Sequence, residues 1–452
     1  MAKRTLGLGK AAKQKKKQKT AEITPEVAET DGSASFPNQP SNEITVELDE
    51  EVDPDDELAQ LKGLWNTYLN SAKDSEHVLN GIIHESDRLL RNQSDEDASK
   101  LSAEFHSIYA LSLAELAIFH TEDQEKGSTV KEFFDAALER IELGQEQFPD
   151  SIELKFAKAK IILNRIPLEY ISKMTLDSAS KEFEINITKL LDDALNNYEE
   201  AEESVILLKN YSLLDRNIFE ILNAFDDLLD IVYNFGKVDE LAEGLDSDEE
   251  EDDLNEQFKL SKKHPLYKIQ QNGKYSQWIQ EHSEKFADLI SLEYDHLLKK
   301  SQQDLSEKES NQISFLKLVS KKTGQLLLQS SEPFSNIFTT LTYDSDNEES
   351  EIDGLDAIKA QKLAIDLTKR AIKFFEKAEE EEEPQSWVDV AEAVISLGNL
   401  YDYESKEQNE SYKIAEKRLK RANNATNGKY QKILDNLINN DDDDDDDDDD
   451  KQ

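Results

Sequence analysis

The sequence predicts an all-α protein made of stacked antiparallel helical hairpins. Apolar residues recur at i, i+3, i+4 and i+7 almost without interruption from about Leu58 to residue 438, which is the spacing of amphipathic helices. The alternation typical of β-strands is nearly absent, and its best instance is the short run Ile44, Val46 and Leu48. That run precedes the periodic region, so we interpret it as a possible docking strand and not as part of a sheet.

Each helix is predicted from its own stretch of periodic apolar residues. The first begins at Leu58 and contains Leu61, Trp65 and Leu69 on one face. Between helices lie stop signals: Phe148-Pro149-Asp150-Ser151 ends one helix and caps the next. The other predicted helices span residues 78–91, 99–120, 129–148, 151–165, 180–200, 215–235, 275–300, 311–329, 355–380, 386–403 and 408–438.

Two segments match the tetratricopeptide pattern at its defining offsets. Ala137, Ile141, Gly144 and Pro149 have the spacing of a second repeat helix, in which small residues allow close helix contact. Leu397-Gly398-x2-Tyr401 matches a first helix, and Ala415, Leu419 and Ala422 follow on its partner. These matches favour a tetratricopeptide-like solenoid; the alternative is that any antiparallel hairpin places small residues at its crossing points.

Stacked hairpins leave an extended surface that can bind another protein. Aromatic residues at helical spacing are candidates for that surface, although such residues more often pack in a core. The candidates are Phe219, Phe225, Tyr233, Phe235, Phe374, Phe375, Trp387 and Tyr401.

The charge pattern divides the chain into seven parts. Residues 1–57 change from basic to acidic and contain four prolines, which predicts a disordered tail. Acidic stretches at 244–257 and 341–353 predict solvated loops between helical blocks at 58–243, 258–340 and 354–438. Residues 439–452 form an acidic tail, in which ten aspartates at 441–450 repel one another; shielding from non-specific contacts and mimicry of nucleic acid are both open as its role.

Composition excludes several classes of function. With 99 acidic and 53 basic residues the net charge is −46, which disfavours binding of nucleic acid by the folded body. The absence of cysteine excludes disulfides and thiolate chemistry and fits a reducing compartment. No run of about 18 apolar residues occurs, so we expect a soluble, intracellular protein that does not span a membrane.

We expect no enzymatic activity, no cofactor and no metal site. The seven histidines are scattered, and no phosphate-binding glycine loop or His-Glu-x-x-His pattern occurs. His282 and Glu284 have the spacing of a facial-triad iron site, but residues at i and i+2 of a helix point to different faces, so chance explains the match better.

The N-terminal segment predicts nuclear import. Residues 3–19 carry eight basic residues and no acid, in two clusters separated by ten residues. Such a bipartite arrangement fits the acidic pockets of an importin-type carrier. The predicted contact residues are Lys3, Arg4, Lys15, Lys16, Lys17 and Lys19. A non-specific RNA- or ribosome-contacting arm and an intramolecular partner for the acidic loops are the competing interpretations.

Two serines in the acidic stretches are candidate phosphorylation sites. Ser247 and Ser345 each have an acid three residues later, at Glu250 and Glu348, as acidophilic kinases require. An acidic loop that happens to contain serine explains the pattern equally well.

The opening Met1-Ala2-Lys3-Arg4-Thr5-Leu6-Gly7-Leu8-Gly9-Lys10, the lysine cluster and the long acidic helical body together resemble the fungal "enhancer of translation termination" family. This resemblance implies a nuclear protein with a tetratricopeptide-like fold. It also implies a partner: a 2-oxoglutarate- and Fe(II)-dependent prolyl-hydroxylase-type dioxygenase linked to accurate stop-codon reading and to oxygen-responsive control of transcription.

The sequence thus leads to two functional hypotheses. The first is a nuclear, non-enzymatic adaptor that binds this dioxygenase and supports translation termination. The second is an acidic chaperone or import escort for basic ribosomal or chromatin proteins, in which the acidic loops and tail shield positive charge.

Overall fold

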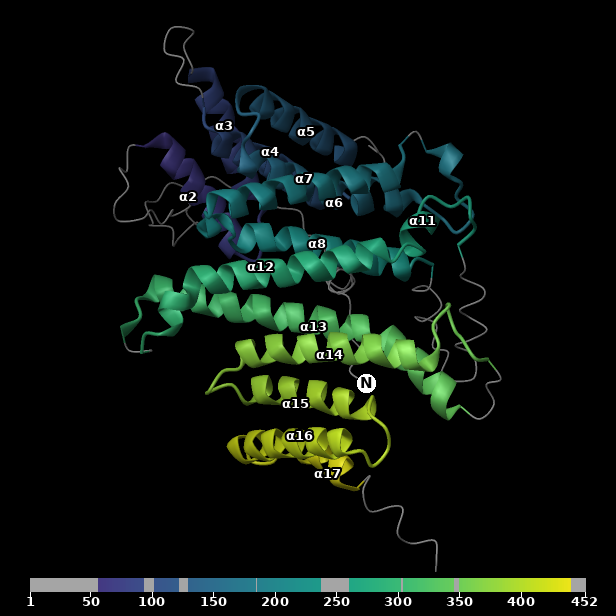
Figure 1. Ribbon diagram of the computed structural model, residues 1–452. Coiled ribbons are helices and arrows are strands. Elements are labelled where there is room, and N and C mark those ends of the chain that lie inside the picture. Colours follow the sequence, from purple (N-terminus) through teal and green to yellow (C-terminus); the bar gives the residue numbers. More distant parts are fainter. Residues whose placement is uncertain are drawn as a thin grey trace, which may run out of the picture. The chain divides into compact units, whose positions relative to one another are not determined.

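A computed structural model describes residues 56–92, 101–121, 129–183, 185–236, 260–301, 304–344 and 349–439 (Figure 1). Throughout these ranges the chain is helical, and the one β-pairing found there is a single bridge between Ile352 and Leu355. The prediction of an all-α fold is therefore confirmed.

The helices begin and end close to the predicted limits. In order they are α2 (Glu57–Asn70), α3 (Glu76–Asn92), α4 (Ala103–Phe119), α5 (Thr129–Gln147), α6 (Ile152–Arg165), α7 (Ile187–Leu208), α8 (Arg216–Tyr233), α11 (Tyr267–Gln270), α12 (Lys274–Leu298), α13 (Glu307–Tyr343), α14 (Ala357–Ala378), α15 (Pro384–Asn399), α16 (Lys406–Ala425) and α17 (Gln431–Asn439). A π-helical turn, Ile166–Tyr170, continues α6, and short 3-10 turns occupy Ile171–Lys173, Ser180–Glu182 and Tyr211–Leu213.

Side-chain caps explain many of the helix starts. Ser102, Ser151 and Ser405 each accept a hydrogen bond from a backbone N–H in the first turn of α4, α6 and α16. Ser306 and Glu309 form a full capping box at the start of α13. These caps satisfy N–H groups that have no partner within the helix, so they fix where each helix begins.

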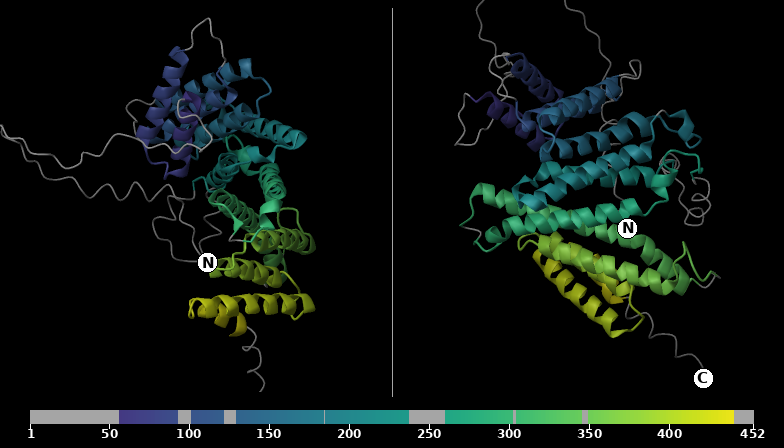
Figure 2. Two further views of the ribbon diagram at one scale, coloured as in Figure 1. Left: turned by 90° about the vertical axis from the view of Figure 1, so that its left-hand side faces the viewer. Right: turned by 45° about the horizontal axis from the view of Figure 1, so that its top comes forward.

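The helices pack as hairpins that follow one another in a stack. Helices α4 and α5, α6 and α7, α13 and α14, and α15 and α16 form the closest pairs (Figure 1). Alternate helices also touch: α2, α4, α6 and α8 contact one another in turn and form what we call the first row. Figure 2 shows this stacking from two further directions. The predicted solenoid of antiparallel hairpins is confirmed.

Helices α7, α12, α14 and α16 form a second row that is linked by ion pairs. In each link the acid lies on the earlier helix and the base on the later one. The links are Lys285 with Glu202 (2.6 Å), Lys377 with Asp288 (2.9 Å) and Arg418 with Glu376 (3.0 Å). The Lys377–Asp288 and Arg418–Glu376 pairs are partly exposed and contribute only about 0–1 kcal/mol each. In the first link Glu202 is buried.

Burial of apolar side chains holds the stack together. One continuous core extends from Ile152 in α6 to Leu434 in α17, and smaller clusters join α2 to α4 and α4 to α6. Because the main core runs through all the hairpins from α6 onward, each hairpin buries its apolar face against its neighbours.

Small residues mark the crossing points of the helices. A Cβ added at Gly144 would come within 2.9 Å of the Cβ of His106, and one added at Gly398 within 2.6 Å of the Tyr412 ring. Ala137, Ile141, Ala415, Leu419 and Ala422 are all fully buried. The residues of both tetratricopeptide matches therefore lie where that pattern requires close packing.

Three helices differ from the sequence-based prediction. The predicted helix at 180–200 is displaced, because α7 spans Ile187–Leu208. The segment 311–329 is part of a longer helix, α13, which continues through Pro333 to Tyr343. The segment 408–438 is two helices, because Asn427 and Gly428 have positive φ angles of 55° and 96° and end α16. Pro333 removes one helical hydrogen bond, and α13 continues through it.

Several predictions lie outside the described residues. They include the disordered tail before α2, the docking strand Ile44–Leu48, the acidic run at 246–253 and the aspartates at 441–450. The division into three helical blocks stays a prediction.

Candidate functional site

A cavity lies along the first row. It has a volume of about 390 Å³, within the range usual for ligand sites, and is lined by α2, α4, α6, α8 and the turn before α8. We call it the first-row groove. Its lining residues are Lys62, Trp65, Asn66, Glu104, Ser107, Ile108, Leu111, Ile152, Glu153, Phe156, Ala157, Lys160, Ser212, Leu213, Asp215, Asn217, Ile218 and Ile221.

The walls of the groove are apolar. Trp65 of α2 is 5% exposed and Phe156 of α6 is 1% exposed, so their rings are held firmly in place. Leu111 of α4 and Ile218 of α8 are half-buried and reach the opening. Helix α4 supplies apolar residues on all sides because it packs against α2, α3, α5 and α6. Such a surface can take up apolar side chains of a partner.

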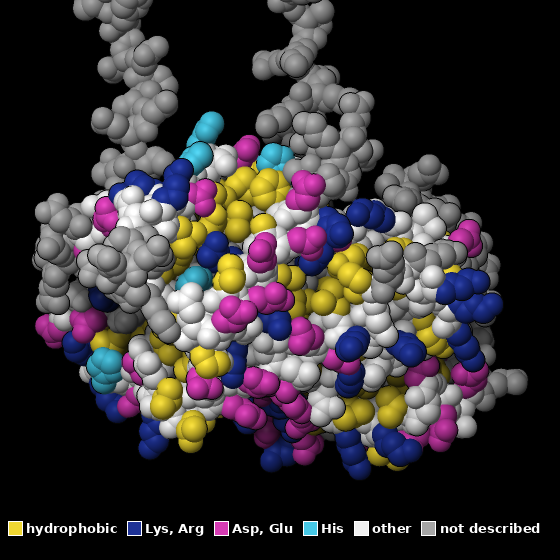
Figure 3. All heavy atoms as spheres, turned by 90° about the horizontal axis from the view of Figure 1, so that it is seen from above, with side chains coloured by type: hydrophobic (Ala, Val, Ile, Leu, Met, Phe, Trp, Pro, Cys, Tyr) yellow, Lys and Arg dark blue, Asp and Glu magenta, His cyan; other side chains and the backbone are white. Residues whose placement is uncertain are grey.

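The rim of the groove is polar. Lys62 of α2 and Glu104 of α4 form an exposed ion pair of 2.6 Å across one edge. Asn66 and Ser212 are exposed beside it. Figure 3, which looks down on the end of the stack formed by α3 and α5, likewise shows charged side chains of both signs interspersed with small hydrophobic areas. An apolar centre with a polar rim is the usual anatomy of a protein-binding surface.

A buried charge cluster lies at the bottom of the groove. Lys160 of α6 is only 5% exposed, and its Nζ lies 2.9 Å from Glu220 Oε2 and 3.3 Å from Glu115 Oε1. Lys73, in the turn after α2, pairs with the other oxygen of Glu220, and the Tyr68 hydroxyl donates to Glu115 over 3.4 Å. Two lysines and two glutamates from four successive first-row elements thus form a neutral cluster.

The pKa values in this cluster follow from the pairing. Burial alone would lower the pKa of Lys160, but attraction to Glu115 and Glu220 outweighs burial and raises it. Burial would raise the pKa of Glu220, but Lys160 and Lys73 outweigh burial and lower it. Both shifts favour the charged forms of Lys160 and Glu220. Lys73 adopts a left-handed conformation (φ 53°), which costs energy and is held by this ion pair.

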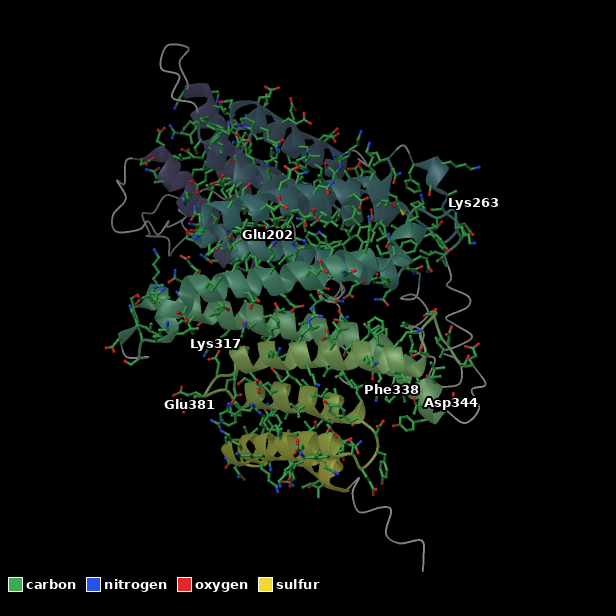
Figure 4. All side chains as sticks on the ribbon, in the orientation of Figure 1. Glu202, Lys263, Lys317, Phe338, Asp344 and Glu381 are labelled. Atoms are coloured by element: carbon green, nitrogen blue, oxygen red, sulfur yellow. The ribbon has the colours of Figure 1, made fainter. Side chains whose placement is uncertain are left out.

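The second cavity is smaller and is closed by its own ion pairs. It measures about 330 Å³ and lies between α13, α14 and α15. Lys317 lies 3.4 Å from Glu380, and Lys321 lies 2.7 Å from Asp389. Figure 4 labels Lys317 within α13, on the same side of the stack as Glu381 in the turn between α14 and α15. Because its charged groups satisfy each other, this cavity is a weaker candidate for binding.

The His282 and Glu284 side chains do not come together. His282 stacks on Trp278 with ring centroids 4.0 Å apart and lies 2.9 Å from Glu202 of α7, whereas Glu284 pairs with Arg370 of α14. Figure 4 labels the buried Glu202 between α7 and α12. The expectation that the two residues point to different faces is confirmed. Within the described ranges, no three His, Asp or Glu side chains are grouped so as to hold a metal ion.

The aromatic candidates belong to the core and not to the groove. Phe219, Phe225, Phe374, Phe375 and Trp387 are at most 5% exposed. Tyr233 and Phe235 are partly buried against the same core, and Tyr401 lies between α15 and α16 beside Lys369. Trp65 and Phe156 line the groove and are equally buried, so the base of the groove is itself part of the core.

The predicted import and phosphorylation residues lie outside the described part of the chain. This holds for Lys3, Arg4, Lys15, Lys16, Lys17 and Lys19, and for Ser247 and Ser345. In the residues that are described, no helix is long and apolar enough to cross a bilayer.

The described helices define a protein of the helical-repeat class with a groove along its first row. The chain matches the model of the family "Nuclear pore complex subunit Nro1" over residues 1–438, and it belongs to that family. It is 47% identical to "Enhancer of translation termination 1" of Debaryomyces hansenii, covering 96% of this chain and 99% of that protein. It is also 47% identical to the protein of the same name in Scheffersomyces stipitis, covering 97% and 100% of the two chains.

Solved structures were also compared. The "S. pombe nuclear import adaptor Nro1" is 16% identical, covers 84% of this chain and 98% of its own, and superimposes with a TM-score of 0.49. The resemblance that the N-terminal residues suggested is therefore confirmed through the family model and the curated relatives.

Proposed function

We propose that the chain is a nuclear, non-enzymatic adaptor that binds a 2-oxoglutarate- and Fe(II)-dependent dioxygenase and supports accurate translation termination. The observation that carries the proposal is the first-row groove, with rigid aromatic walls and a polar rim. The names of the relatives support the link to termination, and the description of the family supports a role at the nucleus. The dioxygenase rests on the family resemblance.

The charged groups in the groove favour binding over chemistry. Lys160 and Lys73 balance the charges of Glu115 and Glu220, and the pKa of Lys160 is raised. A lysine that acts as a general base or nucleophile at neutral pH needs a lowered pKa, so that its amine is uncharged. The cluster instead holds four elements of the first row in a fixed geometry, which lowers the cost of binding a partner.

A blocking substitution tests the groove. Asn66 is exposed on α2 at the rim, so Asn66→Trp would fill the opening without disturbing the core. Asn196→Trp is the matched control, because Asn196 is equally an exposed helical asparagine but lies on α7, away from the groove. We expect Asn66→Trp to weaken dioxygenase binding at least tenfold in a calorimetric titration, and the control to bind like the parent. Equal binding by both variants would contradict the groove assignment.

Nuclear import is tested at the N-terminal segment, which precedes α2 in the sequence. We infer that Lys3, Arg4, Lys15, Lys16, Lys17 and Lys19 contact an importin-type carrier. Deleting residues 1–19 from a fluorescent fusion should abolish nuclear accumulation while leaving dioxygenase binding intact. Unchanged accumulation would refute the import signal but not the groove.

The escort hypothesis makes the opposite prediction for the acidic segments. A carrier of basic clients depends on residues 246–253 and 441–452, so a deletion of both should abolish client binding. An adaptor that uses the groove should keep its partner. Binding measured with and without the two segments therefore separates the hypotheses.

A further inference from the structure

The second row of helices changes sign along the stack. Helix α7 carries six acidic residues and one basic residue, and α12 carries five acidic and two basic. In contrast, α14 carries six basic residues and two acidic, and α16 six basic and three acidic. Two adjacent helices are therefore cationic in a chain whose net charge is −46.

The lysines on the solvent-facing sides of α14 and α16 have no acidic partner. Lys362 and Lys373 of α14 and Lys413 and Lys417 of α16 are exposed, and none of them forms an ion pair with any described residue. Within each helix the spacing places both lysines on one side, opposite the apolar side that packs in the stack. We call these four residues the C-terminal lysine face.

The arginines of the same helices behave differently. Arg370 pairs with Glu284 of α12, and Arg418 with Glu376 of α14, so they belong to the links within the second row. Arg370 and Arg418 therefore connect helices of the second row. The four exposed lysines form no ion pair with a described residue. Like charges on adjacent helices repel, so an anionic ligand on this face would relieve that repulsion.

The chain also contains an anion of matching size. Helix α17, which packs against α16, ends at Asn439, and the ten aspartates begin at residue 441. Ten extended residues reach about 33 Å. The 20 residues of α16 span about 30 Å. The extended aspartate run is therefore about as long as α16.

We propose that Asp441–Asp450 docks in cis on the C-terminal lysine face. The contacts are between carboxylates and ammonium groups and need no defined secondary structure. A short connection gives an effective concentration in the millimolar range, so even individually weak pairs hold the segment in place. The docked segment would cover the one lysine-rich surface identified on the described helices and keep phosphate-bearing ligands from it.

Lysine acylation followed by mass spectrometry tests the proposal in the full-length chain. The variant replaces all ten aspartates by asparagine and so keeps the length of the tail. At about 20 mM salt, we expect Lys413 and Lys417 to react at least threefold faster in the variant than in the parent. At about 500 mM salt the difference should disappear, because the Debye length falls from about 20 Å to about 4 Å. Lys268, an exposed lysine of α11, is the internal control and should not change.

Equal reactivity of Lys413 and Lys417 in both proteins would overturn the proposal, and so would an equal change at Lys268. A protection that weakens on dilution would also overturn it, because docking in cis is independent of concentration.

Titration of the asparagine variant with a free decaaspartate peptide provides a second readout. The variant should bind the peptide, Lys413→Glu/Lys417→Glu in the same background should bind at least tenfold more weakly, and Lys268→Glu should have no effect. If a single-stranded RNA of equal charge binds the variant tenfold more tightly than the peptide, the face is a phosphate-binding surface and the proposal is wrong.

Discussion

Replacement of Lys160 by methionine should destabilise the first row strongly. Lys160 is 5% exposed and contacts both Glu115 and Glu220. Methionine fills a similar volume but leaves two carboxylates with only Lys73 as counter-charge. Removal of one partner from a buried ion pair costs about 3–5 kcal/mol, which is a large part of the stability of a typical domain.

A second substitution should restore much of this loss. In Lys160→Met/Glu115→Gln the cluster is again neutral, because Lys73 still pairs with Glu220, and the new amide oxygen can still accept the hydrogen bond from Tyr68. We expect the double variant to recover at least half of the lost free energy of unfolding. The control Lys62→Met breaks an exposed pair with Glu104 and should cost less than about 1 kcal/mol.

Urea unfolding measures these differences. In a background with Trp278→Phe and Trp387→Phe, the fluorescence of Trp65, which lines the same groove, follows the first row. Circular dichroism at 222 nm follows all helices. A loss below about 1 kcal/mol for Lys160→Met, or no recovery in the double variant, would refute the account of a neutral cluster that joins four elements.

Two further predictions follow from packing and burial. Gly398→Ala should lower the free energy of unfolding by about 1–3 kcal/mol, because the added Cβ would meet the Tyr412 ring. Gly81→Ala should raise it by about 0.5–1 kcal/mol, because Gly81 of α3 has open space around it. Opposite shifts in the urea midpoint are expected, and equal shifts would contradict the reasoning. Burial, assisted by Arg140, lowers the pKa of His106 from 6.5 to about 4, so its contribution to stability is complete above pH 6.5 and is lost as pH falls toward 4. His106→Leu should therefore gain stability relative to the parent as pH drops through this window, and a constant difference would show that His106 does not titrate on unfolding.

Helical periodicity predicted the fold well because every helix buries one face. Its failures are local. Pro333 lies beyond the predicted end of its helix, but packing of α13 on both neighbours maintains the helix despite the missing N–H. Gly428, with its positive φ, lies in the break between α16 and α17. The sequence pattern did not reveal this break, because the apolar residues of α17 continue at helical spacing.

The groove could be predicted only in part. Periodicity places Trp65 and Phe156 on buried helix faces but cannot distinguish a core from the wall of a groove, since both are apolar. Lys160 carried a usable signal, because it lies among the apolar residues of α6, four positions after Phe156. A lysine on a buried face implies acidic partners on the facing helices, but only the three-dimensional structure identifies them as Glu115 and Glu220.

Site-specific photo-cross-linking tests the central claim most directly. A photoreactive amino acid at Asn66, on the rim of the first-row groove, should cross-link to the dioxygenase upon irradiation of the complex. The same group at Asn196, on the exposed side of α7, should yield no cross-link. Cross-linking from Asn196 and none from Asn66 would show that the partner binds elsewhere and would contradict the groove as the binding site.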